Sequence, residues 1–231
     1  ACLLFFSFAW GVCYGDTPLK QKKETREKQI PVDGPYVLYD EAGNMRVIRV
    51  DEQGVVRDSV YGNVPEDFEL DVVSQKGGHR FQVRLHPVER PRWKAEQRVK
   101  TLIISDPHGD LDCFVSVLRN NGVIGKNYKW RFGKNQLIII GDVFDRGKDV
   151  LPIFWLIYKL EQEAQDAGGV VTFMLGNHEE MVLRNNVKYT QDKYKELARN
   201  LGMEYADLWH GNSELGRWLG SRNLIQITGD N

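Results

Sequence analysis

Three short polar clusters in the second half of the chain contain residue types that bind metals and transfer protons. They are Asp106-Pro-His-Gly-Asp110, Gly141-Asp-Val-Phe-Asp-Arg-Gly147 and Gly176-Asn-His-Glu-Glu180. Each follows a short apolar run, and consecutive clusters lie roughly 35 residues apart, which is enough for a strand, a crossover helix and the next strand. Because the ends of parallel strands gather along one edge of a sheet, we expect the three clusters to meet there.

The first cluster places Asp106 and His108 two residues apart at a strand end, so both side chains can turn toward one point. A carboxylate oxygen and an imidazole nitrogen suit Zn, Fe or Mn. Gly109 permits a close approach of backbone, and Asp110 can cap the next helix. The same five residues are also good turn formers, so this motif alone does not identify a metal site.

The second cluster follows the apolar run Leu-Ile-Ile-Ile. Asp142 stands alone at the strand end, where its two oxygens can bridge two cations. Arg146 offers a planar fork that can hold a phosphate, and Asp145 can orient a neighbouring side chain. A surface ion pair between Asp145 and Arg146 is the alternative.

The third cluster ends one strand and begins a helix. Asn177 is either a helix N-cap or a carbonyl ligand for a cation, and the helix dipole favours Glu179 and Glu180. His178 can donate a proton near neutral pH. The order and spacing of all three clusters together predict a phosphate-ester hydrolase built around two metal ions.

These motifs, D-x-H-G-D, G-D-x-x-D-R-G and G-N-H-E, resemble those of the calcineurin-like metallophosphoesterases, specifically the phosphoprotein phosphatase branch with Arg after the second Asp. Residues 205–230, which include the segment 212–219, resemble the bacterial Shewanella-like phosphatase group. The resemblance covers residues 99–231 and leaves residues 35–91 unexplained. It implies an α/β fold, the αββα sandwich of this family, of which this sequence would supply the N-terminal half.

The resemblance also implies two divalent or transition metal ions, Mn, Fe or Zn. Asp106 and His108 would bind the first ion, Asp142 would bridge both, and Asn177 would bind the second. His178 would protonate the leaving oxygen with Asp145 holding its imidazole, and Arg146 would grip the phosphoryl oxygens. Two cations about 3.5–4 Å apart would then generate a hydroxide at neutral pH for an in-line displacement.

One departure from the family pattern concerns the second metal, which in the family also takes two later His residues. The sequence contains no His after His210, which we expect in a surface loop. His79 and His86 are expected to be solvated or internally satisfied. We therefore expect an incomplete copy of a phosphatase that hydrolyses phosphate esters poorly by itself.

The bulk composition is that of an ordinary globular protein. The chain has 31 Lys and Arg against 32 Asp and Glu in 231 residues, so its net charge gives no reason to expect that it binds nucleic acid. Residues 1–15 carry no charged side chain, are too few to span a bilayer and resemble a secretory signal. A buried N-terminal helix or strand is the alternative. We expect an exported, periplasmic protein without an integral membrane span.

Residue composition and hydrophobic pattern divide the remainder of the chain into three parts. Residues 16–34 are a charged linker, residues 35–97 a small β-rich module, and residues 98–231 an incomplete metallophosphoesterase domain. Strands are expected at 36–39, 45–50, 55–56, 81–85, 99–105, 128–132, 136–140, 170–175 and 224–228. Helices are expected at 111–120, 150–167, 192–202 and 213–219.

Several functions fit these observations. The leading hypothesis is a phosphatase acting on a phosphorylated protein or a small phosphoester. A nucleotide hydrolase of the diadenosine-tetraphosphate type shares the three motifs. Missing ligands would instead fit a pseudo-enzyme that binds phosphate or one metal without turnover, and the β-rich module could be an envelope interaction domain.

Overall fold

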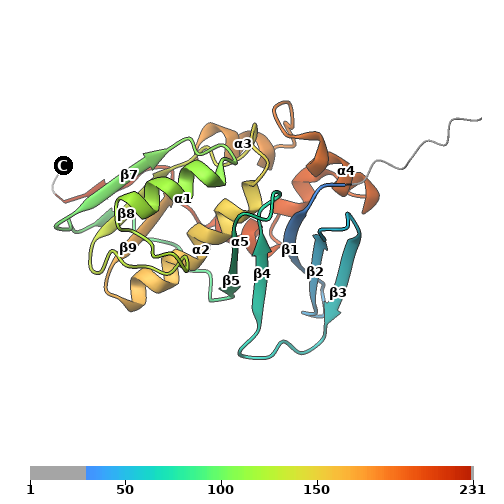
Figure 1. The fold of residues 1–231 in the computed structure, drawn as a ribbon, viewed down its shortest axis with the longest axis horizontal. Helices are drawn as coiled ribbons and strands as arrows, with labels where there is room; N and C mark the ends of the chain where they lie inside the picture. Colours follow the sequence, from blue (N-terminus) through green and yellow to red (C-terminus); the bar gives the residue numbers. More distant parts are fainter. Residues whose placement is uncertain (1–29, 230–231) are drawn as a thin grey trace, which may run out of the picture.

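A computed structural model of the protein describes residues 30–229, in which a β-rich part and a mixed α/β part lie side by side (Figure 1). We refer to residues 33–84 as the β region and to residues 99–229 as the α/β region. The predicted signal segment and most of the predicted charged linker lie outside the described residues. Among the described residues, no helix combines the length and the apolar character needed to cross a membrane.

The β region contains a three-stranded antiparallel sheet of order β1-β2-β3 and a separate hairpin, β4–β5. β1 is buried along almost its whole length because α2 and α5 contact it, as does β4. The sequence pattern missed β4, since two acidic residues interrupt this short strand. The strands are β1 (Asp33–Tyr39), β2 (Met45–Val50), β3 (Val56–Tyr61), β4 (Glu69–Val73) and β5 (Arg80–Arg84).

The α/β region is built on the parallel strands β7 (Thr101–Ser105), β8 (Gln136–Ile140) and β9 (Val170–Met174), in the order β7-β8-β9. Their last residues are paired in register, Ser105 with Ile140 and Ile140 with Met174. The carboxyl ends of the strands are therefore level, and the three polar clusters leave the sheet at one edge, as predicted.

Two crossover helices connect these strands. α1 (Leu111–Asn120) buries Leu111, Phe114 and Leu118, and the Asp110 carboxylate caps it by accepting from the Cys113 N–H at 3.0 Å. The helix bounds match the prediction, since the apolar residues recur at helical spacing. The expected capping role of Asp110 is also confirmed.

The second crossover helix, α2 (Val150–Asp166), joins the two regions. Its residues from Val150 to Tyr158 are fully buried on every side. A helix that is apolar all round needs partners all round. β9 contacts α2 within the α/β region, and β1, β4 and β5 contact it from the β region. The Trp155 Nε1–H also donates to the Pro35 carbonyl at 2.8 Å.

The last part of the chain adds helices around an aromatic core. In it, Phe144, Phe154, Phe173, Trp209 and Trp218 contact one another at ring-centroid distances of 4.5–6.1 Å. The remaining elements are β6 (Lys94–Ala95), α3 (Asn177–Leu183), α4 (Asp192–Asn200), the 3-10 helix η1 (Tyr205–Trp209), α5 (Glu214–Gly220) and β10 (Ile227–Thr228).

Three expected strands differ from the structure, and the one expected at 55–56 is β3, which runs from Val56 to Tyr61. Residues 128–132 form no strand: Tyr128 has φ +61°, which breaks an extended backbone, and one isolated bridge joins Ile124 to Trp130. The strand expected at 224–228 shortens to β10, which pairs in parallel with β6. The fold class itself, mixed α/β, is confirmed.

Candidate functional site

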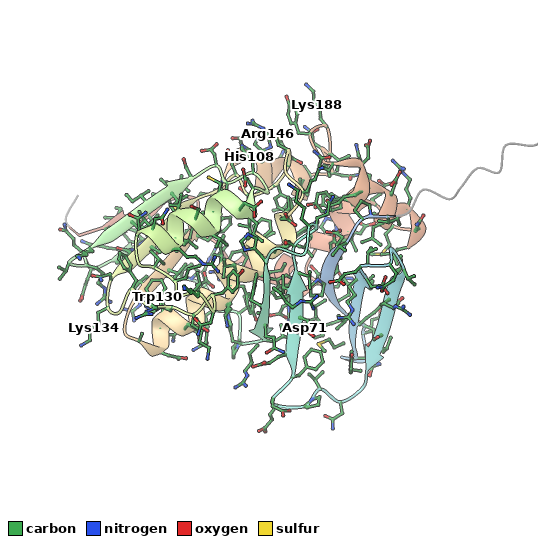
Figure 2. The ribbon with its side chains drawn as sticks, in the orientation of Figure 1. Asp71, His108, Trp130, Lys134, Arg146 and Lys188 are labelled. Atoms are coloured by element: carbon green, nitrogen blue, oxygen red, sulfur yellow. The ribbon has the colours of Figure 1, made fainter. Side chains whose placement is uncertain are left out.

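The loops after β7 and β8 meet at the carboxyl edge of the parallel sheet. The His108 N–H donates to the Asp142 carbonyl at 2.9 Å, so the backbone of the first loop is bonded to that of the second. His108 and Arg146 lie close together at this edge, with Lys188 nearby, whereas Trp130 and Lys134 lie at the opposite end of the sheet (Figure 2).

Strained backbone is concentrated in these two loops. Seven of the described non-glycine residues have positive φ, and five of them are Asp106, His108, Asp142, Asp145 and Arg146. Such conformations cost free energy and persist where the surroundings hold them, which is common at functional sites. The surrounding structure therefore holds the predicted site residues in backbone conformations that cost free energy.

Glycine lets the loops approach closely. A Cβ on Gly147 would lie 2.2 Å from the His108 carbonyl oxygen, and a Cβ on Gly176 would lie 2.2 Å from Asp142 Oδ1. No side chain fits at these distances. The glycines that flank the motifs thus allow all three loops to pack against one another.

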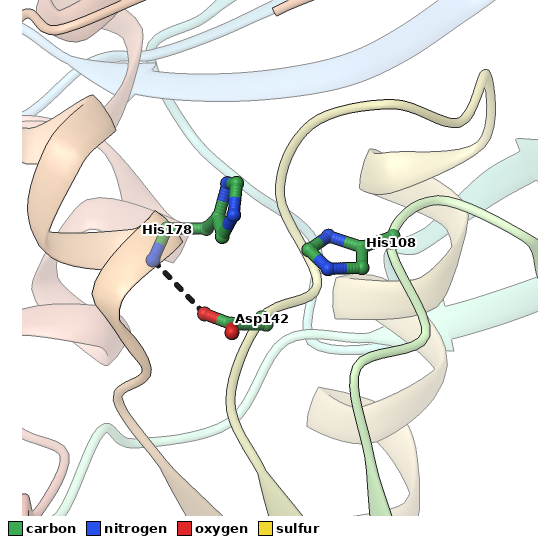
Figure 3. Close-up of side chains that lie close together, drawn as sticks. All are labelled: His108, Asp142 and His178. Carbon is green, nitrogen blue, oxygen red and sulfur yellow. Dashed lines mark hydrogen bonds between the residues drawn. The ribbon is translucent and has the colours of Figure 1, made fainter. Parts of the chain in front are cut away.

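His108, Asp142 and His178 bring their ligand atoms within 4.8 Å of one another (Figure 3). His108 Nδ1 lies 2.8 Å from the Phe144 carbonyl, which can only accept, so Nδ1 carries the proton and Nε2 has a free lone pair. Asp142 Oδ1 accepts from the His178 N–H at 2.9 Å, which fixes the carboxylate. Imidazole and carboxylate donors held this way fit a divalent metal ion.

The other two predicted ligands border this group. Asp106 Oδ1 lies 3.7 Å from His108 Nε2 and is more than half exposed, so the two side chains do turn toward one point. Asn177 is exposed at the first position of α3. Gly176, not Asn177, occupies the N-cap position, so the proposed capping role of Asn177 is wrong.

His178 and Asp145 form a buried pair. Asp145 Oδ2 accepts from His178 Nδ1 at 2.7 Å, and the side chains are 0 % and 6 % exposed, for Asp145 and His178 respectively. The second oxygen, Asp145 Oδ1, accepts from the Thr190 hydroxyl at 2.7 Å. A carboxylate bonded on both oxygens orients the imidazole firmly and leaves His178 Nε2 for chemistry. Thr190 had no signal in the sequence.

Glu179 has a larger role than the sequence indicated. Its buried carboxylate accepts from the N–H groups of Asp142, Val143, Phe144 and Gly176. Burial raises the pKa of Glu179, and these four hydrogen bonds oppose that rise. Glu179 therefore fastens the start of α3 to the second loop. A Glu at the third position of a helix is a known capping signal, which could have pointed to this role.

Arg146 lies exposed at the rim of the site. Its N–H donates to the Tyr189 carbonyl at 3.2 Å, and its own carbonyl accepts from Gln191 Nε2 at 2.5 Å. These two bonds hold the backbone while the guanidinium faces solvent, where an incoming phosphate could meet it.

The remaining described His residues lie outside the metal-binding group. His79 contacts Asp112 and Tyr128, and the two ring nitrogens of His86 lie 3.0 Å from the carbonyls of Pro87 and Tyr158. His210 is half exposed beside Asp207. These positions agree with the expectation of satisfied or surface histidines.

Residues 99–229 match the family model described as calcineurin-like phosphoesterase. The chain belongs to this family. The match spans more than half of the sequence and all three motif clusters, and it confirms the resemblance inferred from them.

Relatives of the chain include Shewanella-like phosphatases. The chain is 32% identical over 114 residues to Shewanella-like protein phosphatase 2 of Arabidopsis thaliana, and 36% identical over 99 residues to Shewanella-like protein phosphatase 1 of Plasmodium berghei. These alignments cover 49% and 42% of this chain and 27% of each relative. The chain thus aligns with about a quarter of each of these relatives.

A solved structure shows the same fold. The chain superimposes on the crystal structure of the cold-active protein-tyrosine phosphatase of a psychrophilic Shewanella species with a TM-score of 0.77 and 27% identity. The superposition covers 86% of this chain and 59% of that chain. Coverage this wide reaches beyond residues 99–229, so at least part of the β region is shared as well.

Proposed function

We propose that this protein is a metal-dependent phosphatase of phosphomonoesters, with phosphorylated protein as its substrate. The observation that carries this proposal is the convergence of His108, Asp142 and His178, with Asp145 bonded behind His178. The relatives named above are protein phosphatases, which supports this substrate class.

In this proposal Asp106 and His108 would hold one ion, Asp142 would be shared by both ions, and Asn177 would contribute to the second. When bound, two divalent cations would supply an acidified water and the positive charge that an in-line displacement at phosphorus needs. The protein keeps the His108 Nε2 lone pair free by bonding Nδ1 to the Phe144 carbonyl. The choice among Mn, Fe and Zn is open to measurement.

His178 is the proposed general acid. Its Nδ1 proton is committed to Asp145, so the proton that moves to the leaving oxygen is the one on Nε2. The buried Asp145 carboxylate stabilises the protonated imidazole before transfer. Arg146 would bind the phosphoryl oxygens from the rim.

A substrate panel and a metal count test this proposal. The protein is loaded with Mn, Fe or Zn and assayed on phosphotyrosine and phosphoserine peptides, an aryl phosphate and diadenosine tetraphosphate. Two ions per chain with turnover of phosphopeptides support it. Preference for the dinucleotide would favour the nucleotide hydrolase, and one ion without any turnover would favour the phosphate-binding or metal-binding pseudo-enzyme.

We also propose that the protein is exported. The support is the apolar segment 1–15, which lies outside the described residues. Mass measurement of the N-terminus of protein purified from its native cells tests this, because processing after Gly11 or Gly15 is expected. An N-terminus that retains the segment would contradict it.

A further inference from the structure

The turn between β4 and β5 belongs to the β region but lies against the loops of the candidate site. We call residues 74–79 the hairpin turn. It is internally fixed, because the Gly77 N–H donates to the Ser74 carbonyl at 2.8 Å and the His79 N–H donates to the buried Ser74 hydroxyl oxygen at 3.0 Å. A turn held this way has a fixed shape, so it can fix the positions of the residues that it contacts.

Its first contact is Asp149, the residue immediately before α2. An Asp at this position ordinarily caps its own helix, yet the Asp149 carboxylate makes no capping bond. Instead its Oδ1 accepts from the Gln75 N–H of the hairpin turn at 2.6 Å. The Asp149 N–H donates in turn to the Gly109 carbonyl at 3.0 Å. Asp149 therefore connects the hairpin turn to the loop that carries His108.

Its second contact is Asp112, in the first turn of α1. His79 Nε2 lies 2.7 Å from Asp112 Oδ1, and His79 Nδ1 lies 2.9 Å from the Tyr128 hydroxyl oxygen. Since a carboxylate can only accept, Nε2 carries the proton. α1 begins three residues after His108, so this hydrogen bond connects the hairpin turn to the helix that directly follows the first loop.

The two loops touch between these contacts. A Cβ on Gly109 would lie 2.9 Å from Gly147 Cα, so the backbones are already at closest approach. The His108 N–H to Asp142 carbonyl bond of 2.9 Å crosses the same junction. The hairpin turn thus bonds to Asp112 and Asp149, and each of these residues follows the point where its own loop touches the other.

We propose that the hairpin turn is a clamp that sets the spacing of the loops carrying His108 and Asp142, with Asp112 and Asp149 as positioning residues. Its effect on metal binding rests on the proposed function; its effect on loop spacing does not. The β region is then part of the machinery that shapes the site.

Hydrogen exchange of the metal-free protein tests the clamp. The reporter is the His108 amide, which is bonded to Asp142 and distant in sequence from every substituted residue except Asp112. Asp149→Ala removes the acceptor for Gln75, whereas Asp149→Asn keeps an oxygen there and is the matched control. We expect exchange at His108 to be about tenfold faster in the alanine variant, in line with one lost charged hydrogen bond, and near the unmodified rate in Asn.

A second pair of variants guards against misfolding. The Asp112 side chain is 74% exposed, so Asp112→Ala leaves packing intact and Asp112→Asn keeps an acceptor for His79. Faster His108 exchange in both alanine variants, restored in both asparagine variants, supports the clamp. Unchanged exchange in the alanine variants overturns it.

Mn²⁺ titration then separates the two proposals. We expect about tenfold weaker Mn²⁺ binding in the alanine variants, the lower range for losing a group that orients metal ligands. An unmodified protein that binds none of Mn²⁺, Fe²⁺ and Zn²⁺ would count against the proposed function, while the exchange rates still decide the clamp. Faster exchange with unchanged Mn²⁺ affinity would overturn the link between loop spacing and metal binding.

Discussion

The antiparallel sheet of the β region and the parallel sheet of the α/β region end their strands in different ways. In the antiparallel sheet, Asp40 and Asp51 close the turns locally: each accepts from the N–H of a residue four positions ahead, Asn44 and Val55. In the parallel sheet, the strand-end loops also depend on hydrogen bonds to residues more than 30 positions away, as Glu179 shows for Asp142. The site residues with positive φ therefore lie in loops whose backbone is held by long-range hydrogen bonds.

The largest effect should come from the side chain at the centre of that long-range arrangement. We predict that, in a catalytically complete version of the protein, Asp142→Asn abolishes the two-metal site and lowers turnover about 10³-fold, because an amide cannot neutralise two cations at once. Elemental analysis of metal content and kcat on an aryl phosphate measure this. Two retained ions with normal activity would remove Asp142 from the bridging role.

A smaller effect is expected at the buried pair. His178→Asn should lower turnover about 10²-fold for esters with poor leaving groups and less for an activated aryl phosphate, whose leaving oxygen needs little protonation. Asp145→Asn should weaken the same step about tenfold by misorienting the imidazole. Equal losses on both ester types would exclude His178 as the acid.

A third variant compares the two ways of closing a loop. Glu179→Gln turns an NH₂ group toward two of the four backbone N–H donors, so we expect it to lower the free energy of unfolding by about 1–3 kcal/mol. Asp51→Asn, in a turn closed by local hydrogen bonds, should lower the free energy of unfolding by less. Urea denaturation measures both, and a larger loss for Asp51→Asn would invert the comparison.

The smallest effect is expected from acid acting on the antiparallel sheet. The Arg46 guanidinium, which donates to Asp58 across β2 and β3, holds the pKa of that carboxyl below its ordinary value. Stability from this pair is therefore present above the unfolded pKa, near 3.9, and is lost as pH falls through the lower folded pKa.

Because both side chains of the pair are 38% exposed, solvent screening limits its contribution to about 0.5 kcal/mol. Comparing the acid unfolding of the unmodified protein with that of Asp58→Asn isolates this term. An identical stability difference at pH 7 and pH 2 would show that the pair contributes nothing.

Much of the α/β region follows from the sequence, because its signals are local. The bounds of α1 were predicted, since one buried stripe with an Asp cap defines it. Motif spacing also placed His108, Asp142 and His178 at one edge, and the structure brings them together. Their catalytic roles stay predictions until the variants above are measured.

What the sequence left out depends on contacts between distant residues. Thr190 reaches Asp145 across 45 positions, and the Asp149 carboxylate leaves its own helix for Gln75. β4 was missed and a strand at 128–132 was wrongly expected, because burial and a positive φ at Tyr128 overrode the local pattern. The predicted division into domains stays a prediction.

Trp209 lies between the loop after β8 and the β region. Its buried indole lies edge-on to Phe144 at 4.5 Å, and Phe144 stands between Asp142 and Asp145. The same indole contacts Tyr36 of β1 at 6.1 Å. One indole therefore touches both the loop that carries Asp142 and a strand of the β region, so a displacement of either would change the surroundings of Trp209.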